Sequence, residues 1–100
     1  MLKKSFSKTG SSCRVTFKLP AEVQAQEVAL LGEFNEWNPE SHVMKQLKDG
    51  SFSLSVSLPA GQDYRFRYLL DGARWENDWE ADDYVVNEHG GKDSLVKLSE

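Results

Sequence analysis

Three tryptophans are the residues of this 100-residue chain whose type and position best suit ligand binding. Trp37 follows a short apolar run, Trp75 follows a turn dipeptide, and Trp79 sits among acidic residues. A tryptophan in a loop offers a flat apolar face and a polar N–H edge, which match the C–H face and hydroxyl rim of a sugar ring. The alternative is that each indole belongs to the core, since tryptophan is highly buried on average.

The acidic residues between positions 76 and 83 suggest two further chemistries, and the pattern fits neither. A glycosidase needs two carboxylates across a cleft, whereas we expect these five to share one exposed, solvated loop: Glu76, Asp78, Glu80, Asp82 and Asp83. Asp78, Glu80 and Asp82 match ligand positions of the EF-hand calcium loop. The glycine and the final glutamate of that loop are replaced by Asp83 and His89. We therefore expect no catalytic residue, no metal ion and no cofactor.

The composition predicts one soluble domain, with 39% hydrophobic and 28% charged residues. A formal net charge of -4 argues against nucleic acid as a partner, and no apolar run reaches the roughly 18 residues of a membrane span. Lys3 and Lys4 are not followed by an apolar stretch, so no secretory signal is visible. Cys13 is the single cysteine and excludes an internal disulfide. These features predict a cytoplasmic protein.

The elements that must position the tryptophans are strands. Residues 51–58 alternate strictly between serine and apolar residues, which predicts a strand with one buried face. The same alternation recurs over 64–70 and 14–19, and shorter runs follow at 28–31 and 95–98. Turn signals separate these segments, and no helical periodicity persists. We predict an all-β antiparallel sandwich of about seven strands over residues 13–100, after a flexible N-terminus of residues 1–12.

The turn at Asp71-Gly72 decides where Trp75 points. If two residues form this turn, Trp75 lies opposite Tyr68 on the core face. If a third residue joins the turn, Trp75 lies opposite Leu69 and shares the outer face with Arg67. We favour the three-residue turn, because this bulged geometry is common and the inner face would otherwise receive a third large aromatic ring.

Three motifs give the chain a resemblance to a known family over residues 28–96. Residues 31–39, L-G-E-F-N-E-W-N-P, resemble the L-G-[DE]-F-N-x-W motif of family 48 carbohydrate-binding modules. Residues 64–72, Y-R-F-R-Y-L-L-D-G, resemble the Y-x-[FY]-[KR]-[FY]-x-[VL]-D-G hairpin of the same modules. Residues 84–94 resemble their closing Y-V-x-N-x-x-G-G-x-N-S segment. Such modules include the glycogen-binding domain of the AMP-activated kinase β subunit and the N-terminal early-set domains of isoamylases and branching enzymes.

The resemblance implies an immunoglobulin-like sandwich that binds α-1,4-glucans such as glycogen or starch without catalysis. Carried over by position, Trp37 and Trp75 would stack on successive glucose rings, and Arg67 would bond sugar hydroxyls. His89 stands where kinase-type members carry an apolar residue that reaches the glucan, and Asp93 stands where they carry asparagine. The carbohydrate-binding residues implied in this way are Trp37, Arg67, Trp75, His89 and Asp93.

The implied partners are an α-glucan oligosaccharide or polysaccharide and a glucan-active enzyme or kinase that the module would bring to it. The start at Met1 and the end after Leu98 look complete, so we expect a free-standing module. The alternative is a protein-interaction or scaffold domain that keeps the fold and has lost sugar binding. Sugar binding requires Trp37, Trp75 and Arg67 on one exposed concave face, whereas a scaffold domain allows buried tryptophans.

Overall fold

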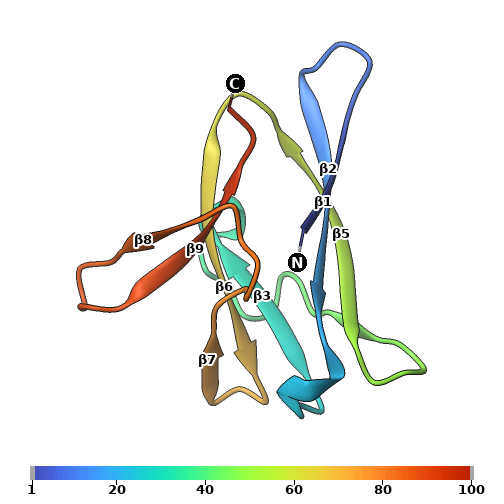
Figure 1. Ribbon diagram of the computed structural model, residues 1–100, viewed down its shortest axis with the longest axis vertical. Coiled ribbons are helices and arrows are strands. Elements are labelled where there is room, and N and C mark those ends of the chain that lie inside the picture. The colour runs from blue at the N-terminus through green and yellow to red at the C-terminus, as the bar shows by residue number, and fades with distance from the viewer. Residues whose placement is uncertain (1, 100) are drawn as a thin grey trace.

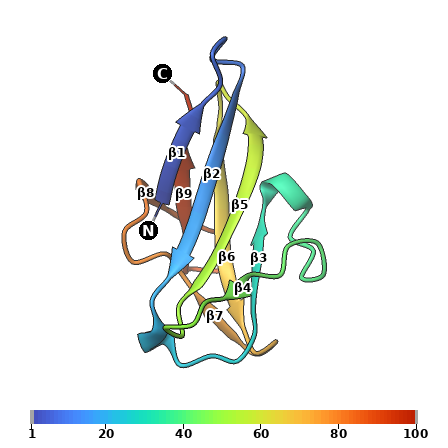
Figure 2. The same ribbon diagram turned by 90° about the vertical axis from the view of Figure 1, so that its right-hand side faces the viewer.

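Two antiparallel sheets packed face to face form the protein, as the computed structural model of residues 2–99 shows (Figure 1). The first sheet has the strand order β1-β2-β5-β4, and the second has the order β3-β6-β9-β8, with β7 also paired to β6. Figure 2 shows β1, β2 and β5 in front of β3, β6 and β9. The predicted all-β sandwich is confirmed, and it has nine strands among the described residues where about seven were expected.

The strands and two short 3-10 helices follow one another along residues 2–99 without an α-helix. None of the helical segments in this range has the length and apolar composition needed to cross a membrane. The elements are β1 (Leu2–Phe6), β2 (Ser12–Leu19), η1 (Ala21–Val23), β3 (Val28–Gly32), η2 (Glu33–Asn35), β4 (Lys45–Gln46), β5 (Phe52–Pro59), β6 (Asp63–Leu70), β7 (Arg74–Glu76), β8 (Asp83–Val86) and β9 (Lys92–Lys97).

Strand β1 differs from the expectation that residues 1–12 precede the sandwich as a flexible segment. Leu2–Phe6 pair with β2 along their whole length. The Lys4 ammonium donates to the carbonyl of Lys97 and forms an ion pair with Asp82, so it links β1 to the second sheet. The polar composition concealed this strand because an edge strand has one neighbour and buries little apolar surface. Met1 and Glu100, which the expected boundaries include, lie outside the described residues.

Alternating residues of the central strands build the core between the two sheets. In β2 and β6 the inward side chains are buried, and they include Phe17 and Phe66, whose rings pack edge to face with centroids 5.0 Å apart. Aromatic pairs prefer this geometry to a face-to-face sandwich. The outward residues of β6, including Arg65 and Arg67, are only half-buried. Strand β6 therefore divides the core from the outer face of the second sheet.

The β6–β7 hairpin turns Trp75 outward. Leu70 pairs with Arg74 and Leu69 pairs with Trp75, so the turn between β6 and β7 contains three residues. Asp71 and Gly72 both have positive φ angles, 53° and 68°, in the left-handed region. The prediction of a three-residue turn with Trp75 opposite Leu69 is confirmed.

Candidate functional site

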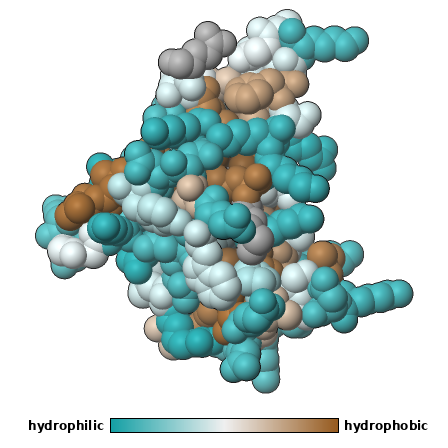
Figure 3. Space-filling view, viewed as in Figure 1, coloured by the Kyte–Doolittle hydropathy of each residue, from teal (hydrophilic) through white to brown (hydrophobic). Residues whose placement is uncertain are grey.

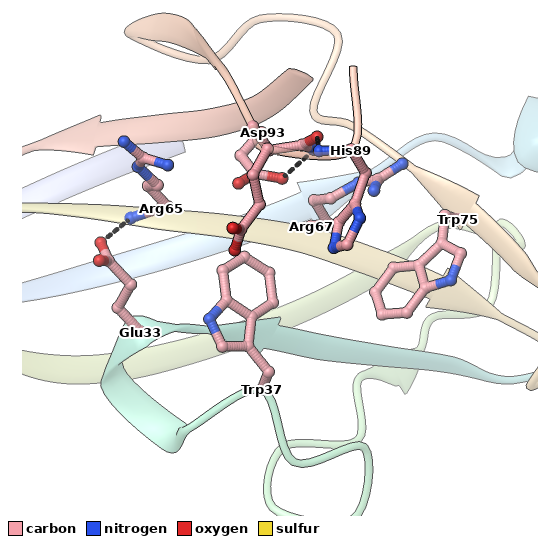
Figure 4. Close-up of a pocket in the computed structure, with 9 residues that line it drawn as sticks. Glu33, Trp37, Arg65, Arg67, Trp75, His89 and Asp93 are labelled. Atoms are coloured by element: carbon pink, nitrogen blue, oxygen red, sulfur yellow. Dashed lines mark hydrogen bonds between the residues drawn. The ribbon is translucent and has the colours of Figure 1, made fainter. Parts of the chain in front are cut away.

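A groove of about 470 Å³ lies over the outer face of the second sheet. Its size falls within the usual range for small-molecule sites. All five residues predicted from the sequence lie along it, although they come from three separate parts of the chain (Figure 4). The lining residues are Glu33, Trp37, Arg65, Arg67, Trp75, Asn87, Glu88, His89 and Asp93.

Trp75 forms one end of the groove from strand β7. Its side chain is 47% exposed, and the Arg67 guanidinium carbon lies 5.2 Å from the centroid of its ring. This cation–π contact holds the indole in place against the sheet. The Nε atom of Arg67 is buried and has no hydrogen-bond partner within residues 2–99. Figure 4 shows His89 and Arg67 between Trp75 and Trp37.

Trp37 forms the other end from the loop that follows η2. Its backbone N–H donates to the carbonyl of Gly32, the last residue of β3, at 3.0 Å. A Cβ atom on Gly32 would lie 2.6 Å from the carbonyl oxygen of Arg65 and 2.7 Å from the ring of Phe34. Glycine is therefore required here by the close approach of β6. The Trp37 side chain is half-buried, so it is neither a core residue nor a free surface side chain.

The β8–β9 hairpin projects sideways from the sandwich and brings a carboxylate into the groove (Figure 1). Asp93 is only 7% exposed, and the Nδ2 amide of Asn87 donates to it at 3.2 Å. The Oδ1 atom of Asn87 accepts from the backbone N–H groups of His89 and Gly91 at 3.0 and 3.1 Å. One asparagine side chain therefore shapes the turn that carries His89 and orients the carboxylate of Asp93.

The groove carries a small excess of negative charge. Its lining holds three carboxylates, of Glu33, Glu88 and Asp93, and two guanidiniums, of Arg65 and Arg67, which sum to -1 with His89 neutral. Glu33 also accepts the backbone N–H of Arg65 at 2.7 Å, which fixes η2 against β6. Carboxylates accept hydrogen bonds and guanidiniums donate them, so the groove combines two aromatic faces with both kinds of polar partner.

Four lining residues were not predicted from the sequence, and they differ in whether a sequence pattern could have identified them. Arg65 shares the outer face of β6 with Arg67, so the alternation of this strand could have identified it. Glu33, Asn87 and Glu88 lie in a 3-10 helix and a turn, where no periodicity marks the side that faces a ligand. Residues 2–99 contain no group of three or more His, Cys, Asp or Glu placed to hold a metal ion.

The acidic segment after β7 corrects the expectation that all five of its carboxylates are exposed and solvated. Asp78 is 1% exposed and accepts the hydroxyl of Tyr68 at 2.7 Å, while its backbone N–H donates to Ser94 Oγ at 2.9 Å. Burial, and then the charge of Asp78, raises the pKa of the Tyr68 phenol well above its usual value. No local pattern indicates this burial, because Asp78 lies in a loop and its partner Tyr68 lies in strand β6.

The third tryptophan lies outside the groove. Trp79 is 51% exposed, and its indole N–H donates to Glu76 at 3.2 Å. Figure 3 shows mainly hydrophilic residues on the face seen in Figure 1, with a hydrophobic area on the projecting β8–β9 hairpin. Val86 of this hairpin is 66% exposed. The three tryptophans of the sequence therefore separate into a pair that shares a groove and one that does not.

Comparisons with known proteins agree with this fold. The sequence profile of carbohydrate-binding module 48 (isoamylase N-terminal domain) matches residues 6–91. A 1,4-alpha-glucan-branching enzyme, chloroplastic/amyloplastic, of Oryza sativa subsp. japonica is 36% identical over 58 residues, which cover 51% of this chain and 7% of the enzyme. The match thus spans a small part of that relative, whereas the profile spans most of this chain. The sandwich, its groove and the profile match together show that the chain belongs to the carbohydrate-binding module 48 family, whose members are non-catalytic binding modules.

Proposed function

We propose that this module binds α-1,4-glucans of the glycogen or starch type in the groove between Trp37 and Trp75. Each indole stacks on one glucose ring, and Arg67, His89 and Asp93 bond hydroxyl groups between them. The observation that carries the proposal is that two tryptophans from different elements line one groove with polar groups between them. The family profile and the branching-enzyme relative support a glucan as the ligand.

The expected affinity is modest, because the groove is open and the contact area small. Stacking that buries roughly 100 Å² of apolar surface on each indole contributes about 2.5 kcal/mol per ring at about 25 cal/mol per Å². Association costs several kcal/mol in lost translational and rotational freedom. A few hydrogen bonds add about 1 kcal/mol each. Together these effects predict a Kd between about 1 μM and 1 mM.

Binding of this strength suits a module that brings a partner to a polymer with many equivalent sites. We propose that it directs a glucan-active enzyme or a kinase to the polysaccharide and catalyses no reaction itself. The buried free thiol of Cys13 supports a reducing compartment, such as the cytoplasm, as the place of action.

Titration with maltoheptaose, followed by protein NMR or tryptophan fluorescence, tests the proposal. Trp37→Ala and Trp75→Ala should each weaken binding by about 2 to 3 kcal/mol, which removes detectable binding if the parent Kd is near 1 mM. Trp79→Ala is the matched control, because it removes an exposed indole outside the groove and should leave the Kd unchanged. Cosedimentation with glycogen should likewise decrease in Trp37→Ala and Trp75→Ala and stay unchanged in Trp79→Ala.

Two results would contradict the proposal. If the parent protein shows no response at about 10 mM maltoheptaose, the module does not bind glucan and the scaffold alternative is favoured. If Trp79→Ala weakens binding as much as Trp37→Ala, the sugar lies elsewhere on the surface.

A further inference from the structure

His42 lies in the same connecting segment as Trp37, between η2 and β4, but it does not line the groove. Its Nδ1 atom is 2.9 Å from the Nδ2 atom of Asn35. The orientation of that amide is fixed, because Asn35 Oδ1 accepts the backbone N–H of Gly32 at 3.0 Å and Nδ2 donates to the carbonyl of Leu30 at 2.9 Å. An amide nitrogen only donates, so Nδ1 of His42 is the acceptor and carries no proton.

The loop held by this amide is conformationally strained. Glu36 and Trp37 have consecutive φ angles of 55° and 58°, in the left-handed region that residues other than glycine rarely adopt. Such conformations persist where the surrounding structure fixes them. The hydrogen bonds of Asn35 to Gly32, Leu30 and His42 provide that restraint at the start of the loop.

We propose that His42 is a positioning residue for Trp37, and that its protonation weakens ligand binding as the pH falls. The imidazolium carries hydrogens on both ring nitrogens, so a donor at Nδ1 would face the donor Nδ2 of Asn35. Rotating the amide of Asn35 would not help, because Oδ1 would then face the carbonyl of Leu30 and Nδ2 the N–H of Gly32. The contact therefore breaks, and the strained loop loses a restraint.

No carboxylate within residues 2–99 forms an ion pair with the imidazole of His42. The ring of Phe34 packs against the imidazole edge to face at 5.9 Å. Strand β3 carries no titratable side chain. The charged or titratable groups on the other elements around this loop are Glu33, Glu36, Glu40, Lys45, Tyr64 and Arg65.

Imidazoles change charge between about pH 8 and 5, whereas carboxylates titrate near pH 4. The protonation of imidazoles is therefore tested by comparing about pH 7.5 with about pH 5.5. The sequence holds one other histidine, His89, which lines the groove, so its effect on binding must be removed. His89→Gln provides the background in which the remaining pH dependence belongs to His42.

The first experiment is an NMR titration of the free His89→Gln protein over this pH range, which needs no ligand. The inference rests on the proposed function only in treating Trp37 as a contact for glucan. The indole signal of Trp37 should shift in parallel with the ring protons of His42, whereas the indole signal of Trp75 should not. A Trp37 signal that stays constant while His42 titrates would overturn the inference.

The second experiment measures the Kd for maltoheptaose at both pH values in the His89→Gln background. Binding should be about three- to tenfold weaker at the lower pH, which corresponds to the loss of about one hydrogen bond. His42→Asn places an uncharged oxygen acceptor near the former Nδ1 position and should make the Kd independent of pH. His42→Phe removes the acceptor and should bind weakly at both pH values.

The outcomes separate this inference from the proposed function. An equal pH dependence with and without His42→Asn would disprove the positioning role. If maltoheptaose binds the wild-type protein at neither pH, the proposed function fails, and the NMR titration of the free His89→Gln protein still decides whether His42 controls Trp37.

Discussion

Trp37 and Trp75 line the same groove, but different interactions hold them in place. Trp75 sits on a strand, opposite Leu69 in a regular antiparallel register, with the Arg67 guanidinium against its ring. Trp37 sits in a loop with left-handed φ angles, whose start is held by the side chain of Asn35. Hydrogen bonds between strand backbones tolerate many different side chains. The restraint at Trp37, in contrast, depends on the side-chain oxygen and nitrogen of Asn35, which form the hydrogen bonds. We therefore expect the Trp37 end to be the more sensitive to mutation and to pH.

A pair of glycine substitutions gives the largest expected contrast between the two ends. Gly32→Ala places a Cβ atom 2.6 Å from a backbone oxygen, and overpacking of this kind costs about 1–3 kcal/mol. Gly72→Ala meets no atom within 4 Å and bears only the cost of its positive φ angle, about 1 kcal/mol. Thermal unfolding should show Gly32→Ala lowering Tm by several degrees more than Gly72→Ala.

NMR spectra of the two variants would extend that contrast. The indole signal of Trp37 should move in Gly32→Ala, and that of Trp75 should move in Gly72→Ala. Equal Tm losses, or a Trp37 signal unchanged by Gly32→Ala, would contradict the view that the two ends are supported differently.

The polar region between the two ends should set the charge preference of the site. Asp93→Asn removes a nearly buried carboxylate and changes the charge of the lining from -1 to 0. Removal of one repulsive charge should favour a maltooligosaccharide that carries a 6-phosphate, relative to the neutral sugar, by about fivefold. Isothermal titration calorimetry with both ligands would measure this ratio.

Asp49→Asn is the control for the Asp93 substitution, because it changes the total charge equally from an exposed turn outside the groove. It should leave the ratio of the two affinities unchanged. A wild-type preference for the phosphorylated ligand would mean that Arg65 and Arg67, and not the carboxylates, dominate the field in the groove.

The smallest expected effect concerns acid stability at the Trp75 end. The Asp71 carboxylate accepts the backbone N–H groups of Gln26 and Glu27 at 2.8 and 2.9 Å and so ties the hairpin to the segment before β3. The bond from Glu27, and then that from Gln26, lowers the pKa of Asp71. A lowered pKa in the folded state stabilises the fold above the unfolded pKa of about 4, and this contribution is lost as pH falls further.

Urea unfolding of the wild type and of Asp71→Asn at several pH values tests whether the charge of Asp71 stabilises the fold above about pH 4. The stability advantage of the wild type should be present at about pH 6 and should shrink below about pH 4. An advantage that persists unchanged at about pH 3 would show that the charge of Asp71 is unimportant. If the advantage shrinks as expected, the Trp75 end loses a support below about pH 4.

The parts of the fold that the sequence predicted are those governed by local rules. Alternation identified β2, β5 and β6, and the Asp71-Gly72 turn predicted the register that faces Trp75 outward. Strand β1 was missed because its polar residues form an edge strand. The burial of Asp78 was missed because its partner Tyr68 lies ten positions away and is brought near by the loop after β7.

The sequence by itself determined the fold class and the strands that alternate, because side-chain period and turn chemistry are properties of neighbouring residues. Its resemblance to family 48 modules named five residues that line the groove, which are Trp37, Arg67, Trp75, His89 and Asp93. Only the tertiary structure joined these residues in one groove, fixed the amide of Asn35 against His42, and brought Asp78 within hydrogen-bond distance of the Tyr68 hydroxyl. These contacts join residues from different elements, so their geometry follows from how the strands and loops pack, and no local pattern encodes it.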